Sequence, residues 1–178
     1  LIVEAQGKYD EAIQILSDLI EKNQKPAATY SSSERNNRSV FLERLGSIYR
    51  ETGRDQQAIE TFRKMLELGH DSAKRGYGQI IDTYRDQKQF NQAVATAQEA
   101  VKAMPKETDM RLVLAGQLAD NGKADEGIAM AKDQLKGGAD DRDVYLAISQ
   151  IYARLRRWPD AEQALDKASA LSNKPEDK

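Results

Sequence analysis

The fold of this chain is decided by residues 42–62, LERLGSIYRETGRDQQAIETF. Apolar residues recur at helical spacing on both sides of a break at Thr52-Gly53-Arg54, so the stretch predicts two short helices joined by a tight turn. The small residues Gly46 and Ala58 stand one in each predicted helix, where they let the two helices approach closely. A single helix pair cannot bury its apolar face alone, and the stretch therefore predicts further pairs in the chain.

The same pattern returns along the chain with a period of about 34 residues. The second helix of each unit carries a small residue, at Ala12, Ala58, Ala93, Gly127 and Ala161. The steps between them are 46, 35, 34 and 34 residues, and a larger apolar residue lies nine positions before each one. Such a period is typical of a stacked helical array. We predict an all-α solenoid of antiparallel helix pairs, with four full repeats and one partial repeat.

The predicted division assigns a partial repeat, an insert, four repeats and a tail. The ranges are 1–22 for the end of a first helix (1–6) and its second helix, 23–38 for the insert or extended helix start, 39–72, 74–107, 108–141 and 142–175 for the repeats, and 176–178 for the tail. Ser31 and Glu34 have capping-box spacing, which predicts a helix starting near Ser32. Because Leu1 is not a methionine, we expect a fragment of a larger or processed protein.

The amino-acid composition excludes several classes of protein. The chain has 178 residues, no cysteine and a net charge of −2, with both signs interspersed. Absence of cysteine excludes disulfides and thiolate chemistry. The charge pattern lacks the basic footprint of a nucleic-acid-binding protein, and no apolar run is long enough to span a membrane. The expected partner is a protein or peptide, with no nucleic acid. The compartment is left open, with the cytoplasm favoured.

Residues able to carry catalysis are sparse. His70 is the only histidine, it lies in a predicted turn, and no cysteine can join it at a metal. A Ser-His-Asp arrangement would need a serine beside it, but Ser72 fits a helix cap. Asp82 and Asp86 share a helix face, which is more typical of a solvated surface than of paired catalytic carboxylates. We therefore expect no enzyme activity, no catalytic residue, no cofactor and no metal site.

The units resemble tetratricopeptide repeats. The second unit matches the family pattern with Leu42, Leu45-Gly46, Tyr49, Gly53, Ala58 and Phe62. The fifth matches with Tyr145, Ile148-Ser149, Tyr152, Ala161 and Leu165. The resemblance implies a right-handed superhelix whose first helices line a concave, protein-binding face. It also implies that a clamp for a C-terminal carboxylate is missing, because Glu43, Ser47, Gly78 and Asp82 stand at the places of its basic and amide residues.

The register of the resemblance predicts a peptide-binding groove. Its expected contact residues are Arg85, Leu112, Asn121, Leu146, Gln150 and Arg154. Leu112 and Leu146 would form an open apolar floor together with Gly116, Ala119 and Ala153, while the polar residues of the set would hold a peptide's polar groups. A second interpretation assigns the groove charges to pairs between neighbouring repeats, such as Glu51 with Arg85 and Asp120 with Arg154.

Two other functions stay open. Apolar end faces could make the chain a scaffold or self-associating segment. Alternatively, it could recruit substrate for a larger enzyme whose catalytic domain lies elsewhere. Two packing expectations complete the prediction: Trp158 fills a gap between helix pairs with the other aromatic residues, and Gly127 leaves slack in its repeat.

Overall fold

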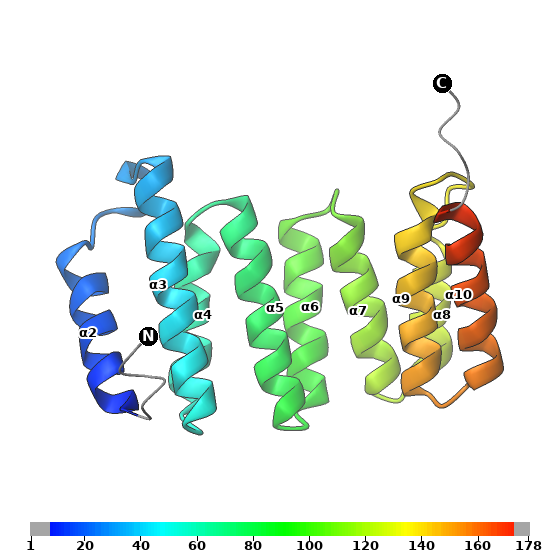
Figure 1. Ribbon diagram of the computed structural model, residues 1–178, viewed down its shortest axis with the longest axis horizontal. Helices are drawn as coiled ribbons and strands as arrows, with labels where there is room; N and C mark the ends of the chain where they lie inside the picture. The colour runs from blue at the N-terminus through cyan, green and yellow to red at the C-terminus, as the bar shows by residue number, and fades with distance from the viewer. Residues whose placement is uncertain (1–7, 173–178) are drawn as a thin grey trace. The chain divides into compact units, whose positions relative to one another are not determined.

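The computed structural model describes residues 8–172, and those residues form helices joined by turns, with no strand among them (Figure 1). The bounds are α2 (Tyr9–Lys22), η1 (Ala27–Thr29), α3 (Ser32–Glu51), α4 (Asp55–Arg63), η2 (Lys64–Glu67), α5 (His70–Asp86), α6 (Phe90–Ala103), α7 (Thr108–Asp120), α8 (Ala124–Lys132), α9 (Asp141–Arg154) and α10 (Trp158–Ser172). The all-α prediction is confirmed. The helix end expected at 1–6 and the tail expected at 176–178 lie outside the described residues.

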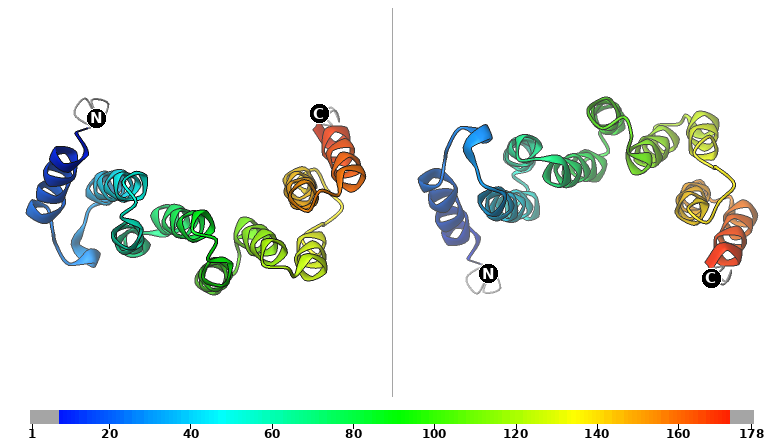
Figure 2. Two further views of the ribbon diagram at one scale, coloured as in Figure 1. Left: turned by 90° about the horizontal axis from the view of Figure 1, so that it is seen from below. Right: turned by 90° about the horizontal axis from the view of Figure 1, so that it is seen from above.

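The chain divides into two compact units, Leu1–Gln89 and Phe90–Lys178. In the first unit α3 packs between α2 and α4, and α4 packs against α5; in the second, α7 packs between α6 and α8, and α9 between α8 and α10. Successive helices within a unit run antiparallel (Figure 1), and the views along the helix axes show the neighbouring helices of a unit side by side (Figure 2). None of the helices from α2 to α10 is both long and apolar enough to cross a membrane.

Each unit has its own apolar core. In the first, Leu42, Ile48 and Phe62 come from the stretch that decides the fold, and all are almost completely buried. A Cβ at Gly46 would overlap the Phe62 ring, so the glycine makes room for the aromatic side chain. In the second, the core gathers small and branched residues from α7 to α10, including Ala115, Ile128, Val144, Ile148, Ile151 and Ala161. The predicted role of small residues in close helix contact is confirmed.

The predicted slack at Gly127 is wrong. A Cβ there would overlap the carbonyl oxygen of Ala115 and lie 3.1 Å from the amide nitrogen of Ala119. The glycine therefore brings α8 into direct contact with the backbone of α7. Because the obstacle is backbone rather than a side chain, nothing nearby can rotate away to admit a methyl group.

Two other expectations are also wrong. Trp158 is 61% exposed at the start of α10 and fills no gap. Ser72 does not cap α5: Gly69 holds the N-cap position, and Ser72 lies in the first turn of the helix, where its Oγ is 2.8 Å from Oγ of Ser39.

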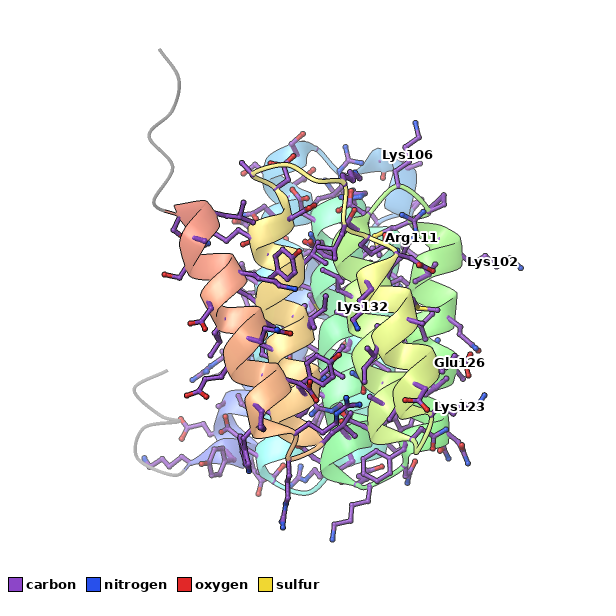
Figure 3. The ribbon with its side chains drawn as sticks, turned by 90° about the vertical axis from the view of Figure 1, so that its right-hand side faces the viewer. Lys102, Lys106, Arg111, Lys123, Glu126 and Lys132 are labelled. Atoms are coloured by element: carbon purple, nitrogen blue, oxygen red, sulfur yellow. The ribbon has the colours of Figure 1, made fainter. Side chains whose placement is uncertain are left out.

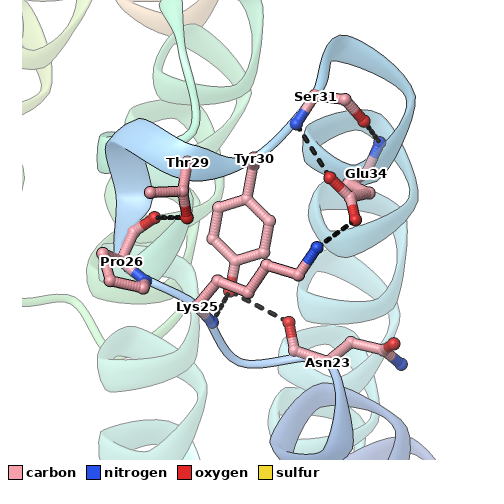
Figure 4. Close-up of polar contacts among 7 residues, drawn as sticks. All are labelled: Asn23, Lys25, Pro26, Thr29, Tyr30, Ser31 and Glu34. Carbon is pink, nitrogen blue, oxygen red and sulfur yellow. Dashed lines mark hydrogen bonds and ion pairs between the residues drawn. The ribbon is translucent and has the colours of Figure 1, made fainter.

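The insert is folded around one buried tyrosine (Figure 4). Tyr30 is 5% exposed; its hydroxyl accepts a hydrogen bond from the Lys25 amide at 2.6 Å and donates one to the Asn23 carbonyl at 3.1 Å. Ser31 and Glu34 form the predicted capping box, and α3 starts at Ser32 as expected. Lys25 also pairs with the Glu34 carboxylate. The insert is thus attached to the first turn of α3 rather than forming a loose linker.

Candidate functional site

The predicted contact residues of the second unit lie on two first helices, α7 and α9. Leu112 is half-buried and packs against the core of the unit, and Leu146 is half-buried one repeat later. Gln150 is exposed one turn further along α9. Because α7 and α9 are the first helices of adjacent repeats, their equivalent positions share one face. On this face the partly exposed side chains of Leu112 and Leu146 lie near the amide of Gln150.

Arg154 closes one end of this face. Its Nε lies 3.4 Å from Oδ1 of Asp120, as the interpretation by charge pairs between repeats predicted. A Cβ at Gly116 would meet Nη2 of Arg154 at 2.5 Å, so the guanidinium lies over the glycine. The expectation of an open floor is therefore corrected at this end: Arg154 covers Gly116, and Ala119 is 3% exposed.

The other two predicted residues have local partners. The side chain of Asn121, directly after α7, donates a hydrogen bond to Oδ1 of Asn91 at 3.0 Å and so links the two ends of helices α6 and α7. Arg85 belongs to α5 in the first unit, where its Nη1 lies 3.4 Å from Oδ1 of Asp82. The pairing of Arg85 with Glu51 and the roles of all six residues in binding stay predictions.

In the first unit, hydrogen bonds and an ion pair connect the two first helices, α3 and α5. The sequence alone did not predict these contacts. Arg75 of α5 donates to Oγ of Ser39 at 2.8 Å, and its Nε lies 3.2 Å from the Glu43 carboxylate of α3. Gln79 donates to the same carboxylate at 3.3 Å. A signal was present: Ser39 and Ser72 stand about one repeat apart, as do Glu43 and Gln79, and such pairs face each other across first helices.

Aromatic and cationic side chains meet on the opposite side of α9. A cavity of about 210 Å³ opens beside Tyr145 and Tyr152, between α8 and α10. Lys167 lies 5.5 Å from the Tyr145 ring centroid, and Arg157 lies 4.8 Å from that of Tyr152. The hydrogen bond from Arg157 to Asp160 raises the pKa of the guanidinium. These contacts stack cations on aromatic faces and leave Arg157 engaged with protein groups.

Basic side chains also lie on α6, α7 and α8 and on the turns beside them (Figure 3). Lys102 and Lys106 extend away from the ribbon, whereas Arg111 donates hydrogen bonds to the Pro105 carbonyl and to Gln134. Lys123 pairs with Glu126 at 3.5 Å. Lys132 lies 5.9 Å from the Tyr152 ring centroid. Several of these cations therefore have partners within the unit.

His70 and one buried acidic residue, Asp141, each have contacts that the structure describes. The imidazole of His70 is exposed at the start of α5, and its Nδ1 lies 3.4 Å from the Asp71 carboxylate. Asp141 is 4% exposed, and its carboxylate accepts hydrogen bonds from the Lys136 and Gly137 amides at 2.7 Å each, which holds the turn before α9. Among residues 8–172 no three acidic or histidine side chains form a group able to hold a metal ion.

Comparison with known proteins agrees with this architecture. Residues 42–76 match the model of a family described as tetratricopeptide repeat. Over 138 residues the chain is 28% identical to a human protein, protein O-mannosyl-transferase TMTC1. That alignment covers 78% of this chain but only 15% of the human protein's length.

Solved structures share the fold at low sequence identity. A crystal structure of MamA aligns with a TM-score of 0.56 and 19% identity, over 96% of this chain and 92% of that one. MamA from Desulfovibrio magneticus RS-1 gives 0.58 and 17%, over 99% and 92%. YrrB, titled a TPR protein with an unusual peptide-binding site, gives 0.52 and 17%, over 96% and 81%. The chain thus shares the helical fold of these solved structures, and residues 42–76 match a single tetratricopeptide repeat.

Proposed function

We propose that this chain is a non-catalytic protein-interaction module that binds an extended peptide segment on the first helices of its second unit. The observation that carries the proposal is the accessible apolar surface of Leu112 and Leu146, which lie at equivalent positions of neighbouring repeats. Beside them, Gln150 and Arg154 supply an amide and a guanidinium for the polar groups of a peptide. An extended chain presents alternate side chains to a surface, so apolar contacts would alternate with polar ones.

Two relatives support an interaction role. YrrB has the same fold and is titled as having a peptide-binding site. In TMTC1 the matched region is a small part of a transferase. YrrB is thus a precedent for peptide binding by this fold, and TMTC1 is a precedent for a similar sequence within a larger protein.

The test uses peptides selected against residues 1–178 from a random phage-displayed library, with affinities measured by titration calorimetry. We expect Leu146→Glu to weaken the selected peptides about tenfold or more, because a carboxylate would then face their apolar side chains. Leu165→Glu is the matched control. It makes the same change in the same unit at a leucine of α10 that is 47% exposed. Equal affinities for the two variants would overturn the placement of the groove.

The similarity to TMTC1 favours a second candidate function, in which the repeats recruit substrate for a larger enzyme. This candidate predicts that the peptides bound by residues 1–178 come from substrates of the full-length protein. Comparing glycosylation of a bound and an unbound peptide by the full-length protein would test it. Equal rates of glycosylation for the bound and the unbound peptide would argue against recruitment.

Self-association remains the third candidate. Ile15 and Leu19 of α2 and Trp158 and Leu165 of α10 are exposed apolar residues on the first and last described helices. Light scattering at rising concentration tests this function. A constant monomer mass would remove it, whereas a mass that rises in the parent and not in Trp158→Glu would support it.

A further inference from the structure

Two lysines face the cavity beside the tyrosines of α9 in the second unit. This cavity of about 210 Å³ lies on a different face of α9 from Leu146. Lys132 extends from α8 toward α9, with its Nζ over the Tyr152 ring (Figure 3). Lys167 of α10 lies over the Tyr145 ring. The cavity therefore has aromatic walls in its middle and an ammonium group on each side.

The charge of these lysines is left for a ligand. Among residues 8–172, neither Lys132 nor Lys167 has a carboxylate partner. The only acid among the described lining residues is Asp160, and its Oδ2 lies 2.7 Å from Nε of Arg157. An aromatic face attracts a cation without neutralising it, and a lysine stem that lies along a ring keeps its ammonium group accessible. The cavity is therefore complementary to an acidic ligand.

The equivalent place in the first unit carries charges of both signs. Lys64 stands three repeats before Lys167 and lines a cavity of about 470 Å³. The lining of that cavity also includes Glu21 and Glu67. The second-unit cavity has two lysines and no acid in place of these glutamates, so its complementarity to an acidic ligand is specific to this unit.

The spacing of the two cations indicates what kind of acid they fit. Tyr145 and Tyr152 are seven residues apart on α9, so they share a face and stand about 10 Å apart along the helix axis. The lysines over them are therefore placed for two separate anionic groups, because a single phosphate is much smaller than that distance. Side chains three residues apart in a polyproline II segment share a face and are separated by about 9 Å.

The size of the cavity favours the same conformation. One turn of a helix, with a diameter of about 10 Å and a pitch of about 5.4 Å, needs roughly 400 Å³, which exceeds the cavity. We propose that this cavity binds an extended acidic peptide segment through two carboxylate side chains three residues apart. The site is separate from the peptide groove on Leu112 and Leu146 and does not depend on it.

The experiment is an NMR titration of the ¹⁵N-labelled chain at constant ionic strength with the acetylated, amidated peptide PEPPEP. Its prolines favour polyproline II and place both glutamates on one face. The peptide PEEPPP keeps the charge and changes the spacing, and PQPPQP removes the charge. Sodium phosphate and a single-stranded deoxythymidine decamer supply other anions.

We expect saturable shifts at the amides of Tyr145, Tyr152 and Lys167 with PEPPEP, and weaker binding of PEEPPP. Shifts that never saturate, or equal affinity for PEPPEP and PQPPQP, would overturn the proposal. Equal affinity for PEPPEP and PEEPPP would overturn the assigned spacing. Tighter binding of phosphate or of the decamer at the same amides would overturn the choice of a peptide as the ligand.

Variants of the lysines locate the site. Lys132→Gln and Lys167→Gln should each weaken PEPPEP about threefold, because each removes one accessible ion pair, and together about tenfold. Lys64→Gln is the matched control in the first unit and should leave the affinity unchanged. Circular dichroism checks that all variants fold. Equal losses in Lys64→Gln and Lys167→Gln would show a general effect of charge and overturn the proposal. Peptides selected for the Leu146 face should keep their affinity in Lys167→Gln, so the two sites can be tested separately.

Discussion

At the scale of single residues, the same substitution of a glycine has opposite effects on stability where the surroundings of the glycine differ. Gly78 of α5 has no atom within 4 Å of the place where a Cβ would stand, whereas at Gly127 a Cβ would overlap the backbone of α7. Both glycines lie inside helices. Helix propensity favours alanine at both positions by the same amount, so packing decides the sign at each.

We expect Gly78→Ala to stabilise the chain by about 0.5–1 kcal/mol and Gly127→Ala to destabilise it by about 1–3 kcal/mol. The first change adds helix propensity in open space; the second forces α7 and α8 apart. Urea unfolding followed by circular dichroism measures both. If both variants gained stability, the close contact of α7 and α8 would be wrong.

Glu34 gives a residue-scale prediction that depends on pH. Hydrogen bonds from Lys25 and from the Ser31 amide lower the pKa of its carboxyl from 4.5 to about 2. The folded chain therefore binds the proton less well than the unfolded chain, and the contribution of the carboxylate to stability is present in full above about pH 4.5 and lost as the pH falls through about 2.

Glu34→Gln imitates the protonated carboxyl at every pH. We expect this variant to have a lower Tm than the parent at pH 7 and the two melting temperatures to converge between about pH 4.5 and 2. Thermal unfolding across that range measures the difference. A gap that stays constant down to pH 2 would contradict the role of the charge.

At the scale of elements, the segment between α2 and α3 shows how one side chain orders a polar loop. Tyr30 supplies the ring that packs against the first core and the hydroxyl that joins Asn23 to Lys25. Arg38 of α3 lies 5.4 Å from the ring centroid and donates to the Ile20 carbonyl at 2.7 Å. The end of α2 and the start of α3 are thus tied through the loop between them.

Tyr30→Phe removes only the hydroxyl, which leaves the Lys25 amide and the Asn23 carbonyl without that partner. We expect a loss of about 1 kcal/mol in the free energy of unfolding. Hydrogen exchange locates the effect: the Lys25 amide should exchange faster in the variant, while amides within α5 should be unchanged. Unaltered exchange at Lys25 would show that the hydroxyl does not hold the loop.

At the scale of the whole molecule, the chain consists of two compact units, each with its own core. The division falls between Gln89 and Phe90, in the turn between α5 and α6. The apolar cluster of the first unit uses residues from α2 to α5, and that of the second uses residues from α7 to α10. Separate cores of this kind allow each unit to fold without the other.

We expect the fragments 1–89 and 90–178 to fold separately. Their far-ultraviolet circular dichroism spectra should add up to that of the intact chain, and each fragment should unfold cooperatively in urea. A cut at 107 is the comparison, because it separates α6 from α7, against which it packs. Unfolded fragments from the cut at 89 would show that the two cores depend on each other.

The sequence by itself determined the helices and their pairing. Period, small residues and turn signals act over a few neighbouring positions, so α2 from Tyr9 to Lys22 and the start of α3 at Ser32 were predictable. The candidate groove was predicted only from the alignment of each repeat with the family pattern. The same alignment predicted the charge pair of Asp120 with Arg154, which the structure confirms.

Only the tertiary structure decided what lies opposite each side chain. Leu165 is 47% exposed, although its counterparts Phe62 and Ala97 in earlier repeats are fully buried. The close fit at Gly127 and the arginine over Gly116 likewise depend on atoms contributed by another helix. Local sequence specifies backbone conformation, whereas the exposure of a side chain arises from contacts between elements. A repeat pattern therefore assigns equivalent residues the same role even where their neighbours differ.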